Sequence, residues 1–391
     1  MKMSTIRNCT LFLFAFFIIS CQQTDENWFD NASKTVDRQL SLASEHYTPE
    51  NNPRSIYPDG TVRLCHLKDW TVGFFPGSLW YAYELTGNAS LKEQAVKYTE
   101  VLDSIKYWTH THDLGFMLYC SYGNAYRLTK NESYKNVLKT GARSLISRYN
   151  SNVQSIRSWD FGEWQFPVIV DNMMNLEYLM WTAEATHDKV YSEIAVNHAN
   201  TTLANHFRDD FSSYHVVSYD TLSGKPIEKG THQGYSDESS WARGQAWGLY
   251  GYTMMYRFTK DPAYLQMAEN IAKLIMSLET MPDDKIPYWD YNAPDIPNAP
   301  RDASAAAITA SALLELSEFT KNGQPYFDYA ESVLMSLSSP EYLANPGENE
   351  FFLLKHSVGA LPNNSEIDTP INYADYYYIE SLLRYKNLKK I

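Results

Sequence analysis

The chain repeats one unit along most of its length, an apolar helix followed after a short turn by an amphipathic helix. The turns recur as well, as Glu84-Leu-Thr-Gly, Arg127-Leu-Thr-Lys, Arg257-Phe-Thr-Lys and Glu318-Phe-Thr-Lys. A helix that is apolar on every face must be covered on every face, whereas an amphipathic helix covers its neighbour and faces water. Hairpin repeats of this kind build either an open solenoid or a closed ring.

Counting the repeats favours the ring. Apolar helices are expected at 77–86, 113–128, 171–185, 239–258, 303–319 and 375–385, and amphipathic helices at 28–46, 88–106, 132–149, 190–207, 262–278 and 326–337. Six inner helices inside six outer ones cover every apolar face. We therefore predict an all-α fold, an (α/α)6 barrel, with an open solenoid carrying capping repeats as the alternative.

Three stretches interrupt the repeat and are expected on the rim. Residues 208–238 alternate polar and apolar, which predicts a β-hairpin with Val216, Val217 and Tyr219 in one strand. Residues 281–302 and 339–372 read as long loops, the second with short strands near 351–354. Long loops in a compact domain tend to carry function.

The N-terminus has the features of a targeting segment. Lys2 and Arg7 precede an apolar run, 11–19, that is too short to span a bilayer, and Ile18-Ile-Ser-Cys21 resembles the lipobox of bacterial lipoproteins. We predict a lipoprotein signal peptide at 1–20 and a single catalytic domain at 21–391. The protein would then be a bacterial cell-envelope lipoprotein, periplasm-facing or in the outer membrane, with membrane contact only through a lipid on Cys21. A plain secretory signal is the alternative.

Composition excludes several classes of function. The formal net charge of −13 argues against nucleic-acid binding. The mature chain would keep only Cys65 and Cys120, too few for a disulfide framework, and no Cys/His cluster has zinc-site spacing. Aromatic residues make up 15% of the chain, which suits a large core and also a carbohydrate cleft.

Two acids begin neighbouring apolar helices. Asp171 follows a Trp-rich stretch that starts at Trp159, and Asp113 begins the preceding inner helix. In a ring both would face the same mouth, where two carboxyl groups can titrate apart and act as acid and base. The alternative for Asp171 is a helix N-cap.

Arg243 and Trp247 are one helical turn apart on the fourth inner helix, expected at 239–258. A guanidinium beside an indole suits a carboxylate on a sugar ring, while an Arg paired with a nearby acid is the structural alternative. His215 is either a site residue or a packing residue. Trp70 and Trp159 are either stacking platforms or core residues.

Several motifs together resemble glycoside hydrolase family 88, the unsaturated glucuronyl hydrolases, including the unsaturated chondroitin disaccharide hydrolase type. They are Asp69-Trp-Thr-Val-Gly-Phe-Phe-Pro-Gly-Ser-Leu-Trp, His112-Asp-Leu-Gly-Phe, Asp171-Asn-Met-Met-Asn-Leu, Gln233-Gly-Tyr-Ser-Asp-Glu-Ser-Ser-Trp-Ala-Arg-Gly-Gln-Ala-Trp and Asn372-Tyr-Ala-Asp-Tyr-Tyr-Tyr-Ile-Glu. The related rhamnogalacturonyl hydrolases carry a Gly-Arg-Gly-Asn-Gly-Trp-like segment where this chain has Trp241-Ala-Arg-Gly-Gln-Ala-Trp.

The resemblance implies an (α/α)6 barrel without metal or organic cofactor. It implies a substrate made by a polysaccharide lyase, an oligosaccharide of glycosaminoglycan type whose terminal uronate has a C4=C5 double bond. Hydration of that vinyl ether releases the uronate. Asp171 matches the proton donor and Asp113 the second acid. The matched substrate-binding residues are Arg243, Trp247, Thr231, Gln233, His215, Trp70, Trp159 and Asn363.

One departure concerns sulfated substrates. Relatives that favour sulfated disaccharides carry Ser and Lys in the last rim loop, and no Lys lies between Ser357 and Asp368 here. The resemblance therefore does not extend to a preference for sulfated sugars. Three other functions remain open at this point: a non-catalytic glycan-binding lipoprotein, a lyase or epimerase on the same barrel, and a rhamnogalacturonyl hydrolase-like enzyme.

Overall fold

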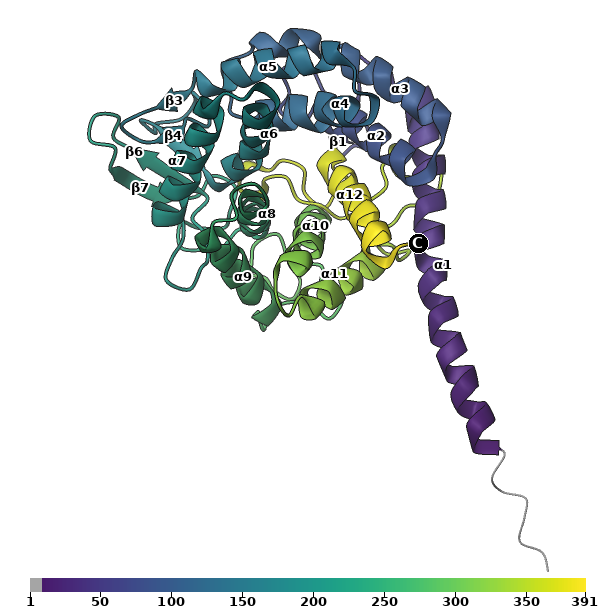
Figure 1. Cartoon of the computed structure of the whole chain (residues 1–391). Coiled ribbons are helices and arrows are strands. Elements are labelled where there is room, and N and C mark those ends of the chain that lie inside the picture. The colour runs from purple at the N-terminus through teal and green to yellow at the C-terminus, as the bar shows by residue number, and fades with distance from the viewer. Residues whose placement is uncertain (1–8) are drawn as a thin grey trace, which may run out of the picture.

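A computed structural model describes the backbone of residues 9–391 and the side chains of residues 28–391. Its helices form two concentric layers (Figure 1). The inner helices are α2 (Phe74–Thr86), α4 (Asn124–Thr129), α6 (Leu176–Thr186), α8 (Ala242–Thr259), α10 (Ala303–Phe319) and α12 (Asn372–Lys389). The outer helices are α1 (Cys9–His46), α3 (Ala89–Glu100), α5 (Glu132–Ile146), α7 (Lys189–Asn205), α9 (Pro262–Ser277) and α11 (Gln324–Leu337).

The inner helices contact their neighbours in chain order, except that α6 is contacted by Gly115–Gly123, the segment that leads into α4. Helix α12 packs against α2, which completes the circuit. Each outer helix from α3 onward packs on the inner helix that precedes it, and α1 packs on α2 and α12. The predicted all-α fold of six inner and six outer helices, with a β-hairpin and long loops on the rim, is confirmed for the described residues.

The recurring turn sequences end one helix and begin the next. The residue after α2, α4 and α8 is left-handed, with φ of 77° at Gly87, 56° at Lys130 and 57° at Lys260. The next residue in these three turns is Asn or Asp, and its side chain accepts a backbone N–H of the first turn of the outer helix. The turn after α10 differs, because Thr320 has a φ of −99°. A left-handed C-cap followed at once by an N-cap is a compact way to reverse the chain.

Two inner helices begin irregularly, which corrects the helices expected from Asp113 and Asp171. A π-helix, η2 (Gly115–Gly123), precedes α4, and a 3₁₀-helix, η3 (Val170–Asn175), precedes α6. The two segments pack closely, since a Cβ on Gly115 would lie 2.4 Å from the Asn175 side-chain oxygen. Asp171 lies inside η3, whose N-cap is Ile169, so the N-cap alternative for Asp171 is wrong.

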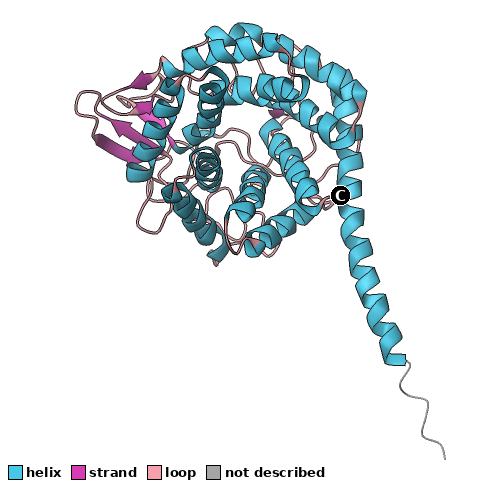
Figure 2. Ribbon diagram, viewed as in Figure 1, coloured by secondary structure: helices cyan, strands magenta, loops and turns pink. Residues whose placement is uncertain are grey.

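The strands form small antiparallel sheets on the rim (Figure 2). The predicted hairpin is present as β6 (Val216–Tyr219) and β7 (Pro226–Gly230), and β5 (Pro167–Ile169) pairs with β6. β5 leads directly into η3 and so fixes the entry to Asp171. The other pairs are β1 (Pro53–Ile56) with β2 (Val62–Leu64) and β3 (Tyr149–Asn150) with β4 (Ser155–Ile156).

The strands expected near 351–354 are wrong. A 3₁₀-helix, η4 (Asn349–Phe351), occupies the start of that stretch, and Leu354 makes an isolated bridge to Leu343. The remaining 3₁₀-helices are η1 (Asp103–Tyr107) and η5 (Leu361–Asn363). Backbone N–H groups of Leu353 and Leu354 bond to the buried Asp375 carboxylate, which holds this loop on α12.

The side chains of the predicted signal peptide and of Cys21 lie outside the described residues, so lipidation stays a prediction. Within the part of the chain that the structure describes, no helix is long and apolar enough to cross a membrane. Cys65 and Cys120 are both buried and free.

A polar cluster fills the axis of the ring away from the rim loops. The Glu380 carboxylate, 6% exposed, accepts hydrogen bonds from Tyr81 (2.8 Å), Tyr250 (3.0 Å) and Ser311 (2.6 Å). These residues belong to α12, α2, α8 and α10. A buried carboxylate is tolerated only where donors replace its water, so Glu380 ties four inner helices to one point. Ion pairs among Arg384, Glu315, Arg257 and Glu177 extend the cluster.

We expect Glu380→Ala to lower the free energy of unfolding by about 3–5 kcal/mol, because it leaves the buried hydroxyls of Tyr81, Tyr250 and Ser311 without their acceptor. Glu84→Ala is the control. It removes the half-exposed ion pair with Arg127 and should cost less than about 1 kcal/mol. Urea unfolding followed by circular dichroism measures both variants, and equal losses would contradict this role of Glu380.

Candidate active site

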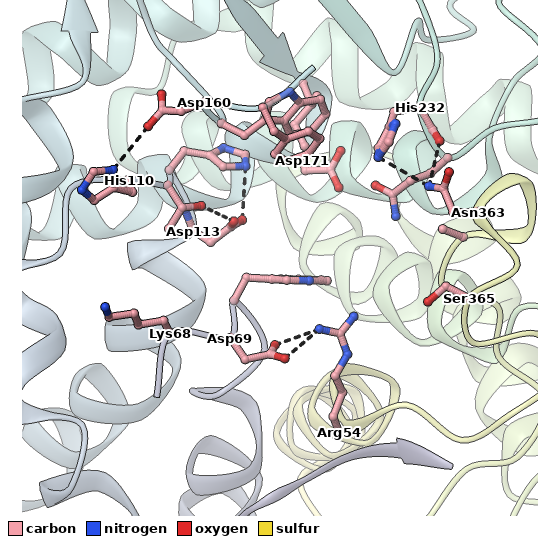
Figure 3. Close-up of a pocket in the computed structure, with 18 of the residues that line it drawn as sticks. Arg54, Lys68, Asp69, His110, Asp113, Asp160, Asp171, His232, Asn363 and Ser365 are labelled. Carbon is pink, nitrogen blue, oxygen red and sulfur yellow. Dashed lines mark hydrogen bonds and ion pairs between the residues drawn. The ribbon is translucent and has the colours of Figure 1, made fainter. Parts of the chain in front are cut away.

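The rim loops and the starts of the inner helices enclose a cavity of about 640 Å³ (Figure 3). Asp113 and Asp171 both line it, as the sequence predicted from their places at neighbouring helix starts. The aromatic walls include Trp70, Trp108, Trp159 and Phe161. The cavity is large enough for a disaccharide and combines flat apolar faces with acids, which is the composition of a carbohydrate site.

Asp171 is the most perturbed acid of the cavity. Asp171 is 7% exposed, and burial raises the pKa of its carboxyl group from 3.8 to about 7. The positive charge of Arg243 and the nearby Trp247 indole lower this pKa, and the charge of Asp113 raises it. Burial prevails, so near neutral pH a large fraction of Asp171 carries a proton.

His215 lies behind Asp171 in a fixed tautomer. Its Nδ1 accepts the backbone N–H groups of His232 (3.0 Å) and Gln233 (3.2 Å), so the ring hydrogen sits on Nε2. Nε2 is 3.6 Å from Asp171 Oδ2. Burial, with the charges of His232 and Arg243, holds the pKa of His215 well below its usual value. A neutral N–H donor therefore faces the acid. In the resting site, the distance between the two groups is longer than a hydrogen bond.

Asp113 has a different environment. The Thr111 hydroxyl donates to Asp113 Oδ2 at 2.5 Å, and His112 Nε2 lies 3.2 Å from Oδ1. Burial lowers the pKa of His112, so that ring is neutral near pH 7. The two acids thus differ in what surrounds them, which is the requirement for two distinct roles.

Arg243 and Trp247 are buried beneath the cavity and do not line it; they are 1% and 0% exposed. Arg243 makes an ion pair with Asp302 at 3.0 Å and donates to the carbonyls of Val358 and Gly359. The guanidinium therefore clamps the last rim loop and acts on Asp171 through charge. A direct contact of Arg243 or Trp247 with a substrate stays a prediction.

The other predicted binding residues divide into two groups. Trp70, Trp159, Gln233 and Asn363 line the cavity, whereas Thr231 and His215 stand behind it. The Thr231 hydroxyl accepts the Gly234 N–H at 2.7 Å, which shapes the turn that carries His232 and Gln233. Gln233 also donates to the Gly359 carbonyl at 3.1 Å and so joins two rim loops.

The sequence did not single out several lining residues. They are Arg54, Arg63, His66, Lys68, Asp69, Trp108, His110, Thr111, His112, Asp160, Phe161, Ile169, His232 and Ala360. Asp69 and His112 were visible as members of the quoted motifs. The others come from loops, and only the fold brings these loops to one mouth. Among the described residues, no group of three or more His, Cys, Asp or Glu is arranged to hold a metal ion.

Comparison with known proteins agrees with this geometry. The model of Glycosyl Hydrolase Family 88 matches residues 43–382. An unsaturated glucuronyl hydrolase of Formosa agariphila is 47% identical over 94% of this chain and 92% of that protein. The crystal structure of an unsaturated glucuronyl hydrolase specific for heparin superposes with a TM-score of 0.93 at 59% identity, covering 94% of this chain and 99% of that one.

A third relative has been crystallised with a sugar. A mutant unsaturated glucuronyl hydrolase of Streptococcus agalactiae, complexed with dGlcA-GalNAc6S, superposes with a TM-score of 0.78 at 30% identity, covering 92% of this chain and 91% of that one. The family match and these identities span the ring, the rim loops and both acids. This chain belongs to glycosyl hydrolase family 88.

Proposed function

We propose that this protein hydrolyses lyase-generated oligosaccharides of glycosaminoglycan type and releases the 4,5-unsaturated uronate from their non-reducing end. The observation that carries the proposal is Asp171, a buried acid with a pKa of about 7 that shares an aromatic-walled cavity with Asp113. The names of the relatives support the substrate class: one is specific for heparin and another binds dGlcA-GalNAc6S.

The chemistry begins with protonation. Asp171 gives its proton to C4 of the vinyl ether, and positive charge develops at C5 beside the ring oxygen. A water oxygen then bonds to C5 while its proton returns to the Asp171 carboxylate. The C5 hemiketal opens to a ketone, which leaves C1 as a hemiacetal bearing the leaving sugar. Collapse of the hemiacetal releases that sugar, one water is consumed, and Asp171 is again an acid.

The surrounding residues serve this sequence. The Asp113 carboxylate faces the cavity, where it stabilises the positive charge at C5. Trp70 and Trp159 stack on the sugar rings, and Gln233 and Asn363 bind their polar groups. The neutral His215 N–H moves into hydrogen-bond range as Asp171 loses its proton, since a carboxylate attracts a donor more strongly than a carboxylic acid does. Thr231 keeps that donor and Gln233 in place, and Arg243 with Trp247 supports Asp171 from below.

We also propose that the mature protein is a lipoprotein of the bacterial envelope, anchored through Cys21. The support is the sequence alone, a basic start, an apolar run and Ile18-Ile-Ser-Cys21. A secreted or surface-anchored location suits an enzyme that acts on fragments of extracellular polysaccharides.

Asp171→Asn should reduce turnover at least about 100-fold, because general acid catalysis is worth about two to four powers of ten. Loss of ultraviolet absorbance by the conjugated uronate measures turnover on lyase-generated disaccharides. Unchanged turnover would refute the role of Asp171, and binding without any loss of absorbance by the wild type would indicate a glycan-binding protein.

The pH profile tests the protonation state. The acid form of Asp171 is needed for the first step, and its raised pKa keeps that form up to about pH 7. We expect kcat/KM to fall as pH rises through about 7, and a profile that stays flat well above that pH would contradict the assignment. The raised pKa also predicts that stability falls as pH rises from about 3.8 to about 7, because the unfolded chain ionises Asp171 before the folded protein does. Asp171→Asn should therefore melt no lower than wild type above about pH 7, which separates lost chemistry from lost folding.

His215→Leu should lower kcat by about tenfold or more, the value of a hydrogen bond to a charged group. It should also move the falling limb of the pH profile to higher pH, because the Asp171 carboxylate loses a donor. His215→Gln places an amide N–H near the former Nε2 position and should restore part of the activity. Equal kinetics in all three proteins would show that His215 only packs.

Anchoring is tested by fractionation. Cys21→Ser should move the protein from the membrane fraction to the soluble fraction and abolish incorporation of labelled palmitate. Cys9→Ser removes the other cysteine of the N-terminal segment and should leave both unchanged. Membrane association of Cys21→Ser would contradict the lipid anchor.

A further inference from the structure

The mouth of the cavity has a basic side. All Lys and Arg residues that line it come from one short segment, as Arg54, Arg63 and Lys68, in a chain whose net charge is −13. The acids that line the cavity are Asp69, Asp113, Asp160 and Asp171. An anionic substrate therefore meets a favourable local charge only where one of these cations is not already neutralised.

Two of the three cations are committed to carboxylates. Buried Arg54 contacts Asp69 at 2.9 Å and Glu366 at 2.7 Å. Arg63 lies 3.4 Å from Glu366 as well. Lys68 is exposed, and among the described residues no carboxylate lies within ion-pair distance of its ammonium group. Lys68 is thus the uncompensated cation of the mouth.

The backbone of Lys68 is held firmly. Its N–H donates to His66 Nδ1 at 3.2 Å, and the Asp69 N–H donates to the His66 carbonyl at 2.8 Å. The Asp69 carboxylate in turn binds Arg54 and the Thr71 N–H. The turn 66–69 is therefore fixed to the ring. His66 uses Nδ1 as an acceptor, so its Nε2 carries the hydrogen and is a second donor beside Lys68.

The Lys68 side chain is also placed. Its ammonium lies 4.3 Å from the centroid of the half-buried Trp108 ring, a cation–π distance, and the rings of Trp108 and His110 are 4.6 Å apart. Figure 3 shows Lys68 on the side of His110 and Asp113, with Asn363 and Ser365 on the opposite side of the cavity. Lys68 is thus separate from the last rim loop, where relatives that favour sulfated disaccharides carry their Ser and Lys.

We propose that Lys68, with His66 and Trp108, binds a sulfo group on the sugar that follows the uronate. This inference rests on the proposed function. The uronate carboxylate is attached to C5, the reacting carbon, and must enter the buried part of the cavity with Asp171. Lys68 stands exposed at the mouth, where the next sugar lies. A sulfo group stays ionised at any working pH and offers three oxygens to an ammonium group. It thus supplies the selectivity that the lysine-free loop 357–368 lacks.

The test compares disaccharides that share the unsaturated uronate. One carries no sulfate, one is sulfated on the amino sugar, and one is sulfated only on the uronate. For Lys68→Gln we expect the ratio of kcat/KM for the amino-sugar-sulfated substrate to that for the unsulfated substrate to fall about threefold to tenfold, mainly through KM. Lys68→Arg keeps the charge and should keep most of the ratio. Lys189→Gln removes a positive charge from the exposed start of α7 and should leave the ratio unchanged.

The outcomes separate this inference from the proposed function. Equal losses on all three substrates would place Lys68 on the uronate carboxylate, and a loss confined to the uronate-sulfated substrate would place the sulfo group on the wrong ring; either result overturns the inference. An unchanged ratio in Lys68→Gln overturns it too. In each case turnover by the wild type still supports the hydrolase, whereas absence of turnover on every disaccharide refutes the proposed function itself.

Discussion

The hydrogen bonds between the Glu380 carboxylate and its hydroxyl donors hold the inner helices together, and the rest of the structure depends on them. The six inner helices, which are nearly apolar on all faces, surround the central axis of the ring. Side chains must fill this axis, because cavities there would lower the stability of the fold. The chain fills one end with Tyr81, Tyr250, Ser311 and Glu380, each on a different inner helix. Directional hydrogen bonds fix the relative rotation of these helices, which apolar packing alone does less strictly. The opposite end can then stay open as a cavity, because the ring is already fixed.

The same physical effect, burial of a carboxyl group, governs both the Glu380 cluster and Asp171. Burial penalises a charged carboxyl group unless donors compensate it. Glu380 receives three hydroxyl donors and remains a structural group, whereas Asp171 has a neutral histidine at 3.6 Å and shares the charge of Arg243 with Asp302. Incomplete compensation therefore keeps the proton on Asp171. Asp113 instead accepts the Thr111 hydroxyl and faces His112. The difference in role between the two acids follows from their donors rather than from their residue type.

Part of this could be read from the sequence, for reasons that are local. Helix period and turn chemistry depend on nearby residues, so α10 (Ala303–Phe319) was predicted with its observed bounds and the strand containing Val216 was found. The irregular starts of the helices at Gly115 and Val170 were missed, because they follow from close packing of Gly115 on Asn175 across two repeats. The pairing of β5 with β6 and the convergence on Glu380 are equally non-local. Both acids were found by position, but the burial of Arg243 and the basic turn at Lys68 required the fold.

Arg54 links the two loops that frame the mouth. Its guanidinium binds Asp69, which anchors the turn of Lys68, and Glu366, which belongs to the last rim loop. Arg243 fixes the same loop from inside through the carbonyls of Val358 and Gly359. Buried guanidinium groups hold both loops in place. Exposed residues of these loops can therefore be substituted without moving Asp113 or Asp171. Reaction chemistry is thereby fixed by the inner ring, while selectivity is left to rim positions such as Lys68 and Asn363. A lysine in the last rim loop, as in relatives that favour sulfated disaccharides, and a free lysine at position 68 on the other side are then alternative ways to bind an anionic sugar at the mouth of the cavity.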